Sequence, residues 1–150
     1  MAVAIRQAEP GEEARLVPAY EWLFAPPGST PRLWDPERGV AALRQAIASS
    51  DSAVLVAVEE GGDLVGFCTA YQELFSVRFG HRVWVEDLAV HPARRSEGIG
   101  KRLLDAAKDW AREQGATHLE LDSAETRADA HRFYEREGPS WRGVSLGWEL

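Results

Sequence analysis

The stretch VEDLAVHPARRSEGIGKR (residues 85–102) joins an apolar strand pattern to a helix pattern through a short turn that contains Gly98 and Gly100. Although the chain has a formal net charge of -7, four cations flank these glycines: Arg94, Arg95, Lys101 and Arg102. The first turn of a helix has N–H groups without acceptors and a partial positive charge, so anions bind there. Glycine removes the side chains that would keep an anion away. The stretch therefore predicts a turn whose main-chain amides bind a phosphate.

Two common phosphate-binding motifs do not fit this turn. A P-loop would need glycine at position 95 and serine or threonine at position 102, but both positions hold arginine. A dinucleotide fingerprint that begins at Gly98 would need glycine or alanine at position 103, where Leu103 stands. The turn is therefore neither a nucleotidase P-loop nor a Rossmann turn.

The composition predicts a soluble domain that spans residues 1–150. The chain is 45% hydrophobic and 27% charged, and its apolar runs are too short to span a bilayer. Its start, MAVAIRQAEP, lacks the apolar core of a secretory signal. A single cysteine excludes an internal disulfide, and the acidic balance argues against a nucleic-acid binder. We expect a cytoplasmic protein that binds neither nucleic acid nor membrane; a homodimer is an option that the sequence leaves open.

The remaining patterns predict a mixed α/β domain in the order β-α-α-β-β-β-α-β-α-β. Apolar alternation and β-branched residues predict strands at 3–8, 53–60, 64–72, 82–91, 117–123 and 144–150. Helical spacing predicts helices at about 12–24, 36–48, 99–115 and 127–137. Prolines and Gly28 make residues 24–36 a loop between the first two helices.

Two motifs resemble those of one enzyme family. Residues 95–100, RSEGIG, follow the pattern (Arg or Gln)-x-x-Gly-x-(Gly or Ala) and come after VEDLAVHP. This resembles the acetyl-CoA-binding turn of the GNAT superfamily of N-acyltransferases. Residues 128–138, ADAHRFYEREG, resemble its second motif, a helix with Ala-x-x-(Phe or Leu)-Tyr followed by glycine. The resemblance is sharp from about Val83 to Gly138 and weak before Val54.

The resemblance implies a GNAT-like fold, with acetyl-CoA as acyl donor and no metal. Ala130 and Phe133 would pack beside the pantetheine and thiol end of the cofactor, and Tyr134 would place its hydroxyl near the sulfur. The full set of implied cofactor-binding residues is Leu88, Ala89, Val90, Arg95, Ser96, Glu97, Gly98, Ile99, Gly100, Lys101, Arg127, Ala130, Phe133 and Tyr134.

The chain departs from the family pattern at two places. Many members have asparagine where Arg127 stands, and this arginine would either reach a cofactor phosphate or cap its helix. The family often continues glycine-phenylalanine, but Gly138 is followed by Pro139, Ser140 and Trp141, so the path of the last strand stays open.

The implied reaction is direct attack of an amine on the acetyl thioester, without a covalent enzyme intermediate. An alkylamine with a pKa near 10.4 is mostly protonated at pH 7, so a base is needed. The resemblance favours Glu86 as that base, with Asp87 as the alternative; strand neighbours face opposite sides, so only one should face the amine. It also implies that the Leu88 N–H binds the thioester oxygen. Val90 would pair with the pantetheine amides, and Tyr134 would protonate or hydrogen-bond the departing thiolate.

The acceptor site should combine aromatic and acidic side chains, which suit a cationic amine. The predicted acceptor-binding residues are Trp22, Phe24, Trp34, Glu73 and Glu86, with Asp35, Glu37 and Phe75 near them. We expect an N-acetyltransferase that acts on a small-molecule amine. The alternatives are a protein N-terminal or lysine acetyltransferase and a catalytically silent acyl-CoA-binding module.

No other nucleophile or metal site stands out. Cys68 lies in an apolar strand pattern without a flanking base, so we expect an inert thiol. The four histidines lack metal-ligand spacing, and we expect no metal.

Overall fold

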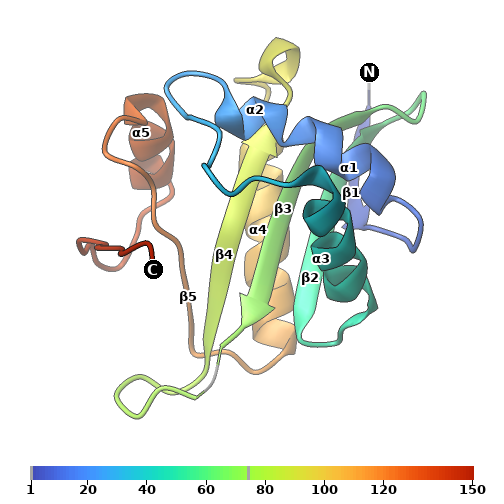
Figure 1. Ribbon diagram of the computed structural model, residues 1–150. Coiled ribbons are helices and arrows are strands. Elements are labelled where there is room, and N and C mark those ends of the chain that lie inside the picture. Colours follow the sequence, from blue (N-terminus) through green and yellow to red (C-terminus); the bar gives the residue numbers. More distant parts are fainter. Residues whose placement is uncertain (1, 74) are drawn as a thin grey trace.

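The computed structural model describes residues 2–73 and 75–150. Five strands form one sheet in the order β1-β2-β3-β4-β5, with α1, α2 and α3 on one face and α4 on the other (Figure 1). The strands are β1 (Val3–Gln7), β2 (Ser52–Glu59), β3 (Leu64–Gln72), β4 (Arg82–Val90) and β5 (His118–Glu120). The helices are α1 (Glu13–Ala19), α2 (Glu21–Phe24), α3 (Pro36–Ala48), α4 (Ile99–Glu113) and α5 (Ala128–Arg136). The predicted mixed α/β class is confirmed.

Each face of the sheet has its own buried core. The predicted apolar face of α4 packs on one side and includes Leu103 and Trp110, against Val83 and Val85 of β4. Helices α1 and α3 pack on the other side, around the fully buried Phe67 of β3. Both cores include residues of β4, so they hold in place the strand that carries the candidate site.

Strands β4 and β5 separate after a short parallel ladder. They pair only through Arg82–His118, Val83–Leu119 and Trp84–Glu120, after which β4 continues to Val90 paired with β3 but not with β5. The strand predicted at 117–123 is therefore too long, because its second half loses its neighbour and with it the hydrogen bonds of a ladder. The separation leaves a gap between β4 and the segment that leads to α5 (Figure 1).

A β-bulge interrupts β4 where the separation begins. Asp87 pairs with Thr69 and Val85 pairs with Ala70, so Glu86 is an extra residue without a partner on β3. A bulge shifts the alternation of side chains by one residue. Val85 accordingly packs toward α4, whereas Ala89 packs toward α1 and α3.

The structure corrects two predicted elements. The helix predicted at 12–24 is divided into α1 and α2 at Tyr20, after Pro18, whose missing N–H removes one helical hydrogen bond. The strand predicted at 144–150 is wrong: residues 138–150 form neither helix nor strand and are exposed. A strand needs a free neighbouring edge of similar length, and β5 offers only three residues.

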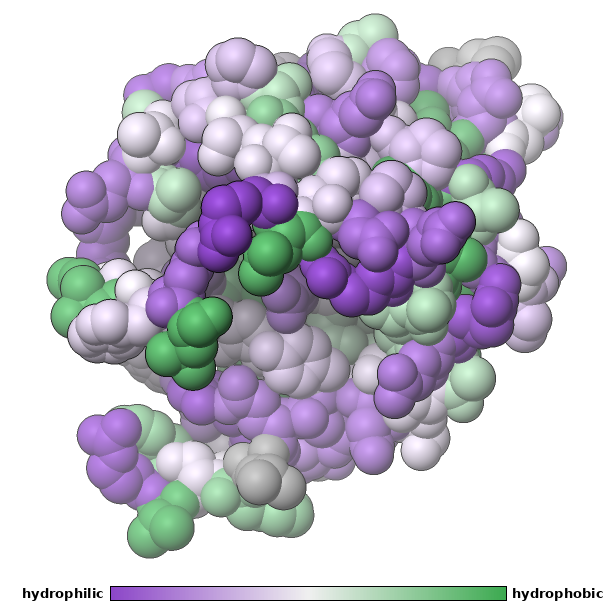
Figure 2. All heavy atoms as spheres, viewed as in Figure 1, coloured by the Kyte–Doolittle hydropathy of each residue, from purple (hydrophilic) through white to green (hydrophobic). Residues whose placement is uncertain are grey.

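Apolar side chains are also exposed at the tip of the loop between β3 and β4. Phe75, Val77 and Phe79 are each more than half exposed, and this tip stands apart from the rest of the molecule at the lower left of Figure 2. Among the helices of the described residues, none has both the length and the apolar character needed to cross a membrane.

Candidate active site

The turn before α4 is built to expose main-chain amides. A 3₁₀ turn (Pro92–Arg94) begins after His91, whose Nδ1 accepts a hydrogen bond from the Ala93 N–H at 3.0 Å. Gly98 then caps α4 with φ of 82°, a left-handed conformation that favours glycine. Apart from Gly98 itself and its chain neighbours, no described atom lies within 4 Å of where its Cβ would stand. The first-turn N–H groups of α4 lack intrahelical acceptors and face this open space.

Two of the four predicted cations are neutralised within the protein. Arg94 forms ion pairs with Glu59 and Glu97, and Lys101 bonds to Asp105 and Glu137. The main-chain amides and the helix dipole are therefore more important for an anion here than the formal charges of the turn suggest.

Arg95 instead donates to two carbonyl oxygens. Its Nε bonds to the Val90 oxygen at 3.2 Å and its terminal nitrogen to the Trp22 oxygen at 3.3 Å. Ser96 and Glu97 are exposed beside it, whereas the Ile99 side chain is buried in the core. Ile99 can therefore reach a ligand only through its backbone.

The free edge of β4 can pair with an extended ligand. The His91 N–H donates to the Val65 oxygen of β3 at 2.9 Å. In an antiparallel ladder alternate residues bond to the same neighbour, so the Ala89 N–H also faces β3. The N–H groups of Leu88 and Val90 consequently point into the gap, as the roles predicted for these two residues require.

The far side of the gap is formed by the β5–α5 segment. Phe133 packs against the first turn of α4, with its Cζ 3.7 Å from where a Cβ at position 100 would stand. Ser123 Oγ is buried and has no hydrogen-bond partner among the described residues. The main-chain turn and the free β4 edge together suit a long, polar ligand such as coenzyme A.

Tyr134 lies on α5, and Arg127 directly precedes this helix. Burial raises the pKa of Tyr134 to about 12, so its hydroxyl is protonated at neutral pH. The Arg127 side chain donates to the Leu23 oxygen of α2 at 2.7 Å, across the gap; Arg127 occupies the N-cap position of α5, but its side chain makes no capping hydrogen bond. The helix-capping alternative for Arg127 is therefore wrong. Ala130 is half-buried on the same helix.

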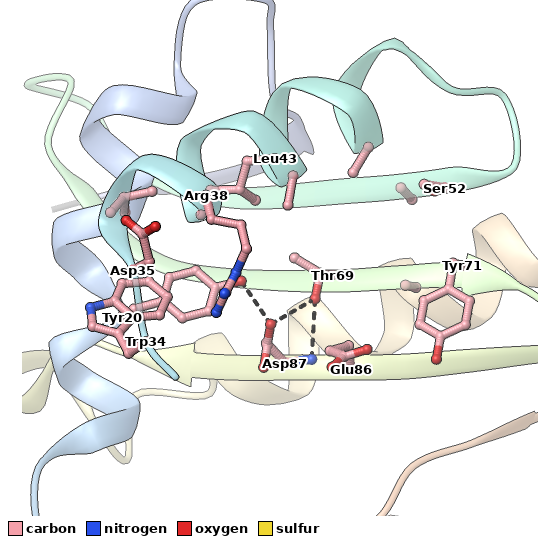
Figure 3. A pocket seen from close by; sticks show the side chains of 16 residues that line it. Tyr20, Trp34, Asp35, Arg38, Leu43, Ser52, Thr69, Tyr71, Glu86 and Asp87 are labelled. Carbon is pink, nitrogen blue, oxygen red and sulfur yellow. Dashed lines mark hydrogen bonds between the residues drawn. The ribbon is translucent and has the colours of Figure 1, made fainter. Parts of the chain in front are cut away.

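A cavity of about 430 Å³ lies between the sheet and helices α1 and α3 (Figure 3). Its aromatic lining is Tyr20, Trp34 and Tyr71, and its charged lining is Asp35, Arg38, Glu86 and Asp87. The cavity thus has three carboxyl groups and one guanidinium, and its carboxylates suit the ammonium group of a ligand.

Asp87 is the most firmly held carboxylate of the cavity. Its Oδ2 accepts hydrogen bonds from the Tyr20 hydroxyl at 2.7 Å and the Thr69 hydroxyl at 3.2 Å (Figure 3). Its own N–H donates to Thr69 Oγ1 at 3.1 Å. Burial raises the pKa of Asp87, although both hydroxyl hydrogen bonds oppose the rise. These contacts leave Oδ1 as the oxygen available to a ligand.

Glu86 lines the same cavity at the bulge. Loss of surrounding water, then the negative charges of Asp87 and Asp122, raise the pKa of Glu86 above its ordinary value. A carboxylate with a raised pKa is a stronger base. Both Glu86 and Asp87 line the cavity, so the strict alternation used to choose between them does not hold at the bulge.

Of the predicted acceptor residues, Trp34 and Glu86 lie at this cavity and three others do not. Trp22 packs on Phe67 and His91, with ring centroids 6.1 and 5.1 Å away. Phe24 lines a separate hollow of about 400 Å³ that shares Trp34. Glu73 is paired with Arg82, near the start of β4.

Three further residues were predicted near the acceptor site, and of these only Asp35 lies at the cavity. Asp35 lines the cavity, and its Oδ1 accepts from the N–H of Glu37, which is not among the lining residues. The exposed Phe75 lies on the loop between β3 and β4.

Tyr20, Arg38 and Thr69 line the cavity but are not among the residues predicted from the sequence. The only available signals were weak: Tyr20 follows Leu16 by four residues on the apolar face of its helix, and Thr69 is a polar residue in an apolar strand. Nothing in the sequence near Arg38 distinguishes it from other exposed helical cations.

Removal of the Asp122 charge should lower the pKa of Glu86. Asp122 is exposed after β5, and its negative charge disfavours ionisation of Glu86. In an Asp122→Asn variant we expect the carboxyl carbon of Glu86 to titrate at lower pH in an NMR titration. Asp109→Asn, an exposed substitution on α4, is the control and should leave the titration unchanged; an unchanged curve in Asp122→Asn would contradict the assigned cause.

The described residues provide neither a reactive thiol nor a metal site. Cys68 is fully buried, which raises the pKa of its thiol to about 12, so it is not a thiolate at neutral pH. Within residues 2–73 and 75–150, no three His, Cys, Asp or Glu side chains are grouped so that they could hold a metal ion.

The chain resembles known proteins in sequence and in fold. The chain is 33% identical over 134 residues to Uncharacterized N-acetyltransferase YhfO of Bacillus subtilis (strain 168), covering 89% of this chain and 87% of that protein. It is 38% identical over 95 residues to Streptothricin acetyltransferase of Streptomyces lavendulae, covering 63% of this chain and 48%, about half, of that protein. An aminoglycoside N-acetyltransferase solved in complex with CoA has the same fold, with a TM-score of 0.83 at 18% identity over 99% of this chain and 95% of that one. The model of the Acetyltransferase (GNAT) family matches residues 16–138, and the chain belongs to this family.

Proposed function

We propose that this protein transfers the acetyl group of acetyl-CoA to the amine of a small molecule. The observation that carries the proposal is the meeting of two features at the β4 bulge. The gap between β4 and β5 begins there, and the same bulge directs Glu86 and Asp87 into an acidic cavity.

The residues along the gap would hold the cofactor. The amides of Gly98 and the first turn of α4 would bind its diphosphate. The Val90 N–H would pair with its pantetheine arm, as an added strand pairs with a sheet edge. Arg95 and Arg127 flank this path from opposite sides, and each has N–H donors beyond those bonded to α2.

Acetyl-CoA, when bound, supplies the acetyl group as a thioester. Asp87 would orient the acceptor as its ammonium, and Glu86 would remove one proton, directly or through water. The amine nitrogen would then form a bond to the carbonyl carbon as the carbon–sulfur bond breaks, and the nitrogen would lose its second proton to water, which leaves the neutral amide. The Leu88 N–H would donate to the carbonyl oxygen as negative charge develops there. Tyr134 would give its proton to the departing sulfur, and solvent would restore it.

The cavity favours a small acceptor. Its volume of about 430 Å³ lies within the range of small-molecule sites, which is about 300–1,000 Å³. The names of two relatives, streptothricin and aminoglycoside N(6')-acetyltransferases, refer to small amine-bearing molecules. These names support a small-molecule amine over a protein lysine or N-terminus.

A thiol-release assay tests the proposal against the silent-module alternative. Acetyl-CoA binding is measured first by calorimetry, and free thiol is then followed with a panel of small amines and with peptides. Turnover with at least one small amine supports the proposal. Binding without turnover for any amine would identify a silent module, and turnover with peptides alone would move the activity to protein substrates.

Substitution of Tyr134 by phenylalanine should lower kcat by about tenfold to thirtyfold. A thiolate whose conjugate thiol has a pKa of about 8.5 is already a good leaving group near pH 7. Its protonation therefore lowers the barrier only modestly. Steady-state kinetics and calorimetry should show the loss in kcat, with acetyl-CoA affinity nearly unchanged. An equal loss in affinity and kcat would argue for a packing role of the tyrosine instead.

A further inference from the structure

We infer that the acceptor carries an anionic group in addition to its reacting amine, and that Arg38 binds this group. The inference rests on the proposed function of the same cavity. It specifies the class of acceptor: a zwitterionic small molecule with an amine at one end and a carboxylate, phosphonate or phosphate at the other.

Arg38 is the cation that the cavity leaves without an internal counter-charge. It lies in the first turn of α3, and its side chain extends into the cavity (Figure 3). Of the described residues that line the cavity, Arg38 alone is a cation. Although three carboxylates share this lining, none in the described part of the chain lies within 4.0 Å of its guanidinium, in contrast to Arg82 and Arg94, which are paired.

The guanidinium is held but not saturated. One of its nitrogens donates to the Leu33 carbonyl, which fixes the direction of the side chain. A guanidinium has five N–H donors in a planar fork that matches carboxylate and phosphate oxygens. Donors therefore remain for an anion within the cavity.

Opposite walls of the cavity favour ligand groups of opposite charge. Glu86 and Asp87 come from β4, where the gap for the cofactor begins, so the reacting amine belongs at this wall. Arg38 comes from α3, which covers the other side (Figure 3). Asp35 lies on the same side as Arg38, but no ion pair joins these two described residues, and Asp35 Oδ1 accepts from the Glu37 N–H at 3.0 Å. A diamine would place its second cation toward Arg38, and the two like charges would repel.

Matched pairs of ligands test the inference by binding, without any need for turnover. Each pair is an ω-amino acid of two to six carbons and its ω-amino amide, which keeps the shape and the amine but removes the negative charge. For the best-fitting length we expect the acid to bind roughly tenfold or more tightly than the amide in calorimetry with acetyl-CoA absent.

Substitutions then assign the preference to Arg38. Arg38→Gln should bring the acid and the amide to about equal affinity, while affinity for the amide stays unchanged. Arg38→Glu should reverse the order and favour a diamine of the same length. Arg112→Gln removes a cation on the surface of α4 and should preserve the preference of the unaltered protein.

Equal binding of acid and amide by the unaltered protein at every length would overturn the inference, as would a preference that survives Arg38→Gln. These outcomes are separate from failure of the proposed function. Arg38-dependent binding without turnover would support the zwitterion site and remove the acetyltransferase proposal. Turnover of plain amines and diamines with no effect of Arg38→Gln would do the reverse.

Discussion

A Gly98→Val variant should fold and yet lose more than about a hundredfold in acetyl-CoA affinity, because a branched side chain would occupy the open space above the first-turn amides of α4. The cost to folding should be small. Beyond the chain neighbours no described atom would contact the new Cβ, so the main penalty is the positive φ of 82°, which costs about 1–2 kcal/mol for a non-glycine residue. Calorimetric titration of acetyl-CoA and a thermal unfolding curve measure the two effects separately.

The chain provides a matched control at the other end of the same helix. Gly115 follows α4 with φ of 79°, and again no described atom lies within 4 Å of where its Cβ would stand. Gly115→Val therefore imposes the same backbone strain away from the turn. It should lower the unfolding temperature as much as Gly98→Val does and leave acetyl-CoA affinity intact. If both variants bind normally, or both lose binding equally, the ligand does not occupy the turn at Gly98.

The strand, turn and helix from Val83 to Trp110 could be predicted because their signals are local. Glycine at a left-handed position, an apolar face at helical spacing and a run of β-branched residues each act within a few neighbours. The structure confirms a strand to Val90 and a helix from Ile99 whose predicted face is buried. The helix predicted at 127–137 also forms, as α5, because its signal depends on the same helical period.

The acceptor cavity could not be predicted, because it depends on which residues oppose one another across the sheet. The bulge at Glu86 appears only in the pairing of β3 with β4, and it alone brings Glu86 and Asp87 to one cavity. The Tyr20–Asp87 hydrogen bond joins residues 67 positions apart. Aromatic and acidic composition thus indicated the kind of lining but selected Trp22, Phe24 and Glu73, whose neighbours lie elsewhere.

In the C-terminal segment, by contrast, the local pattern predicts a strand that does not form. Val144, Leu146, Trp148 and Leu150 alternate as a strand should, but a period of two only makes a strand suitable for one buried face. Whether the strand forms depends on an available partner edge. In this chain the edge is the three-residue β5, and the apolar side chains of the segment stay exposed.

Replacement of Glu86 by glutamine should lower kcat/KM for the acceptor by about 10² to 10³ at pH 7. Glutamine keeps the size of the side chain but cannot accept a proton. An alkylamine with a pKa near 10.4 is neutral in only about one molecule in a few thousand at pH 7, and this sets the upper limit of what a base can contribute. The effect should exceed that of Tyr134→Phe, because the amine is further from its pKa at neutral pH than the leaving thiol is. Steady-state rates over a range of acceptor concentrations measure it.

The pH dependence separates a base from a merely acidic neighbour. If Glu86 removes the proton, the deficit of Glu86→Gln should shrink as the pH rises toward 10, because the free amine then forms without help. The unaltered protein should lose activity on the acid side as Glu86 becomes protonated, and this limb should lie above the ordinary range of glutamate, because the pKa of Glu86 is raised. Glu113→Gln, which removes an exposed carboxylate at the end of α4, should reproduce the unaltered profile. A deficit that stays constant across this range would mean that Glu86 only attracts the cationic acceptor, and the proton would then have to leave through Asp87 or water.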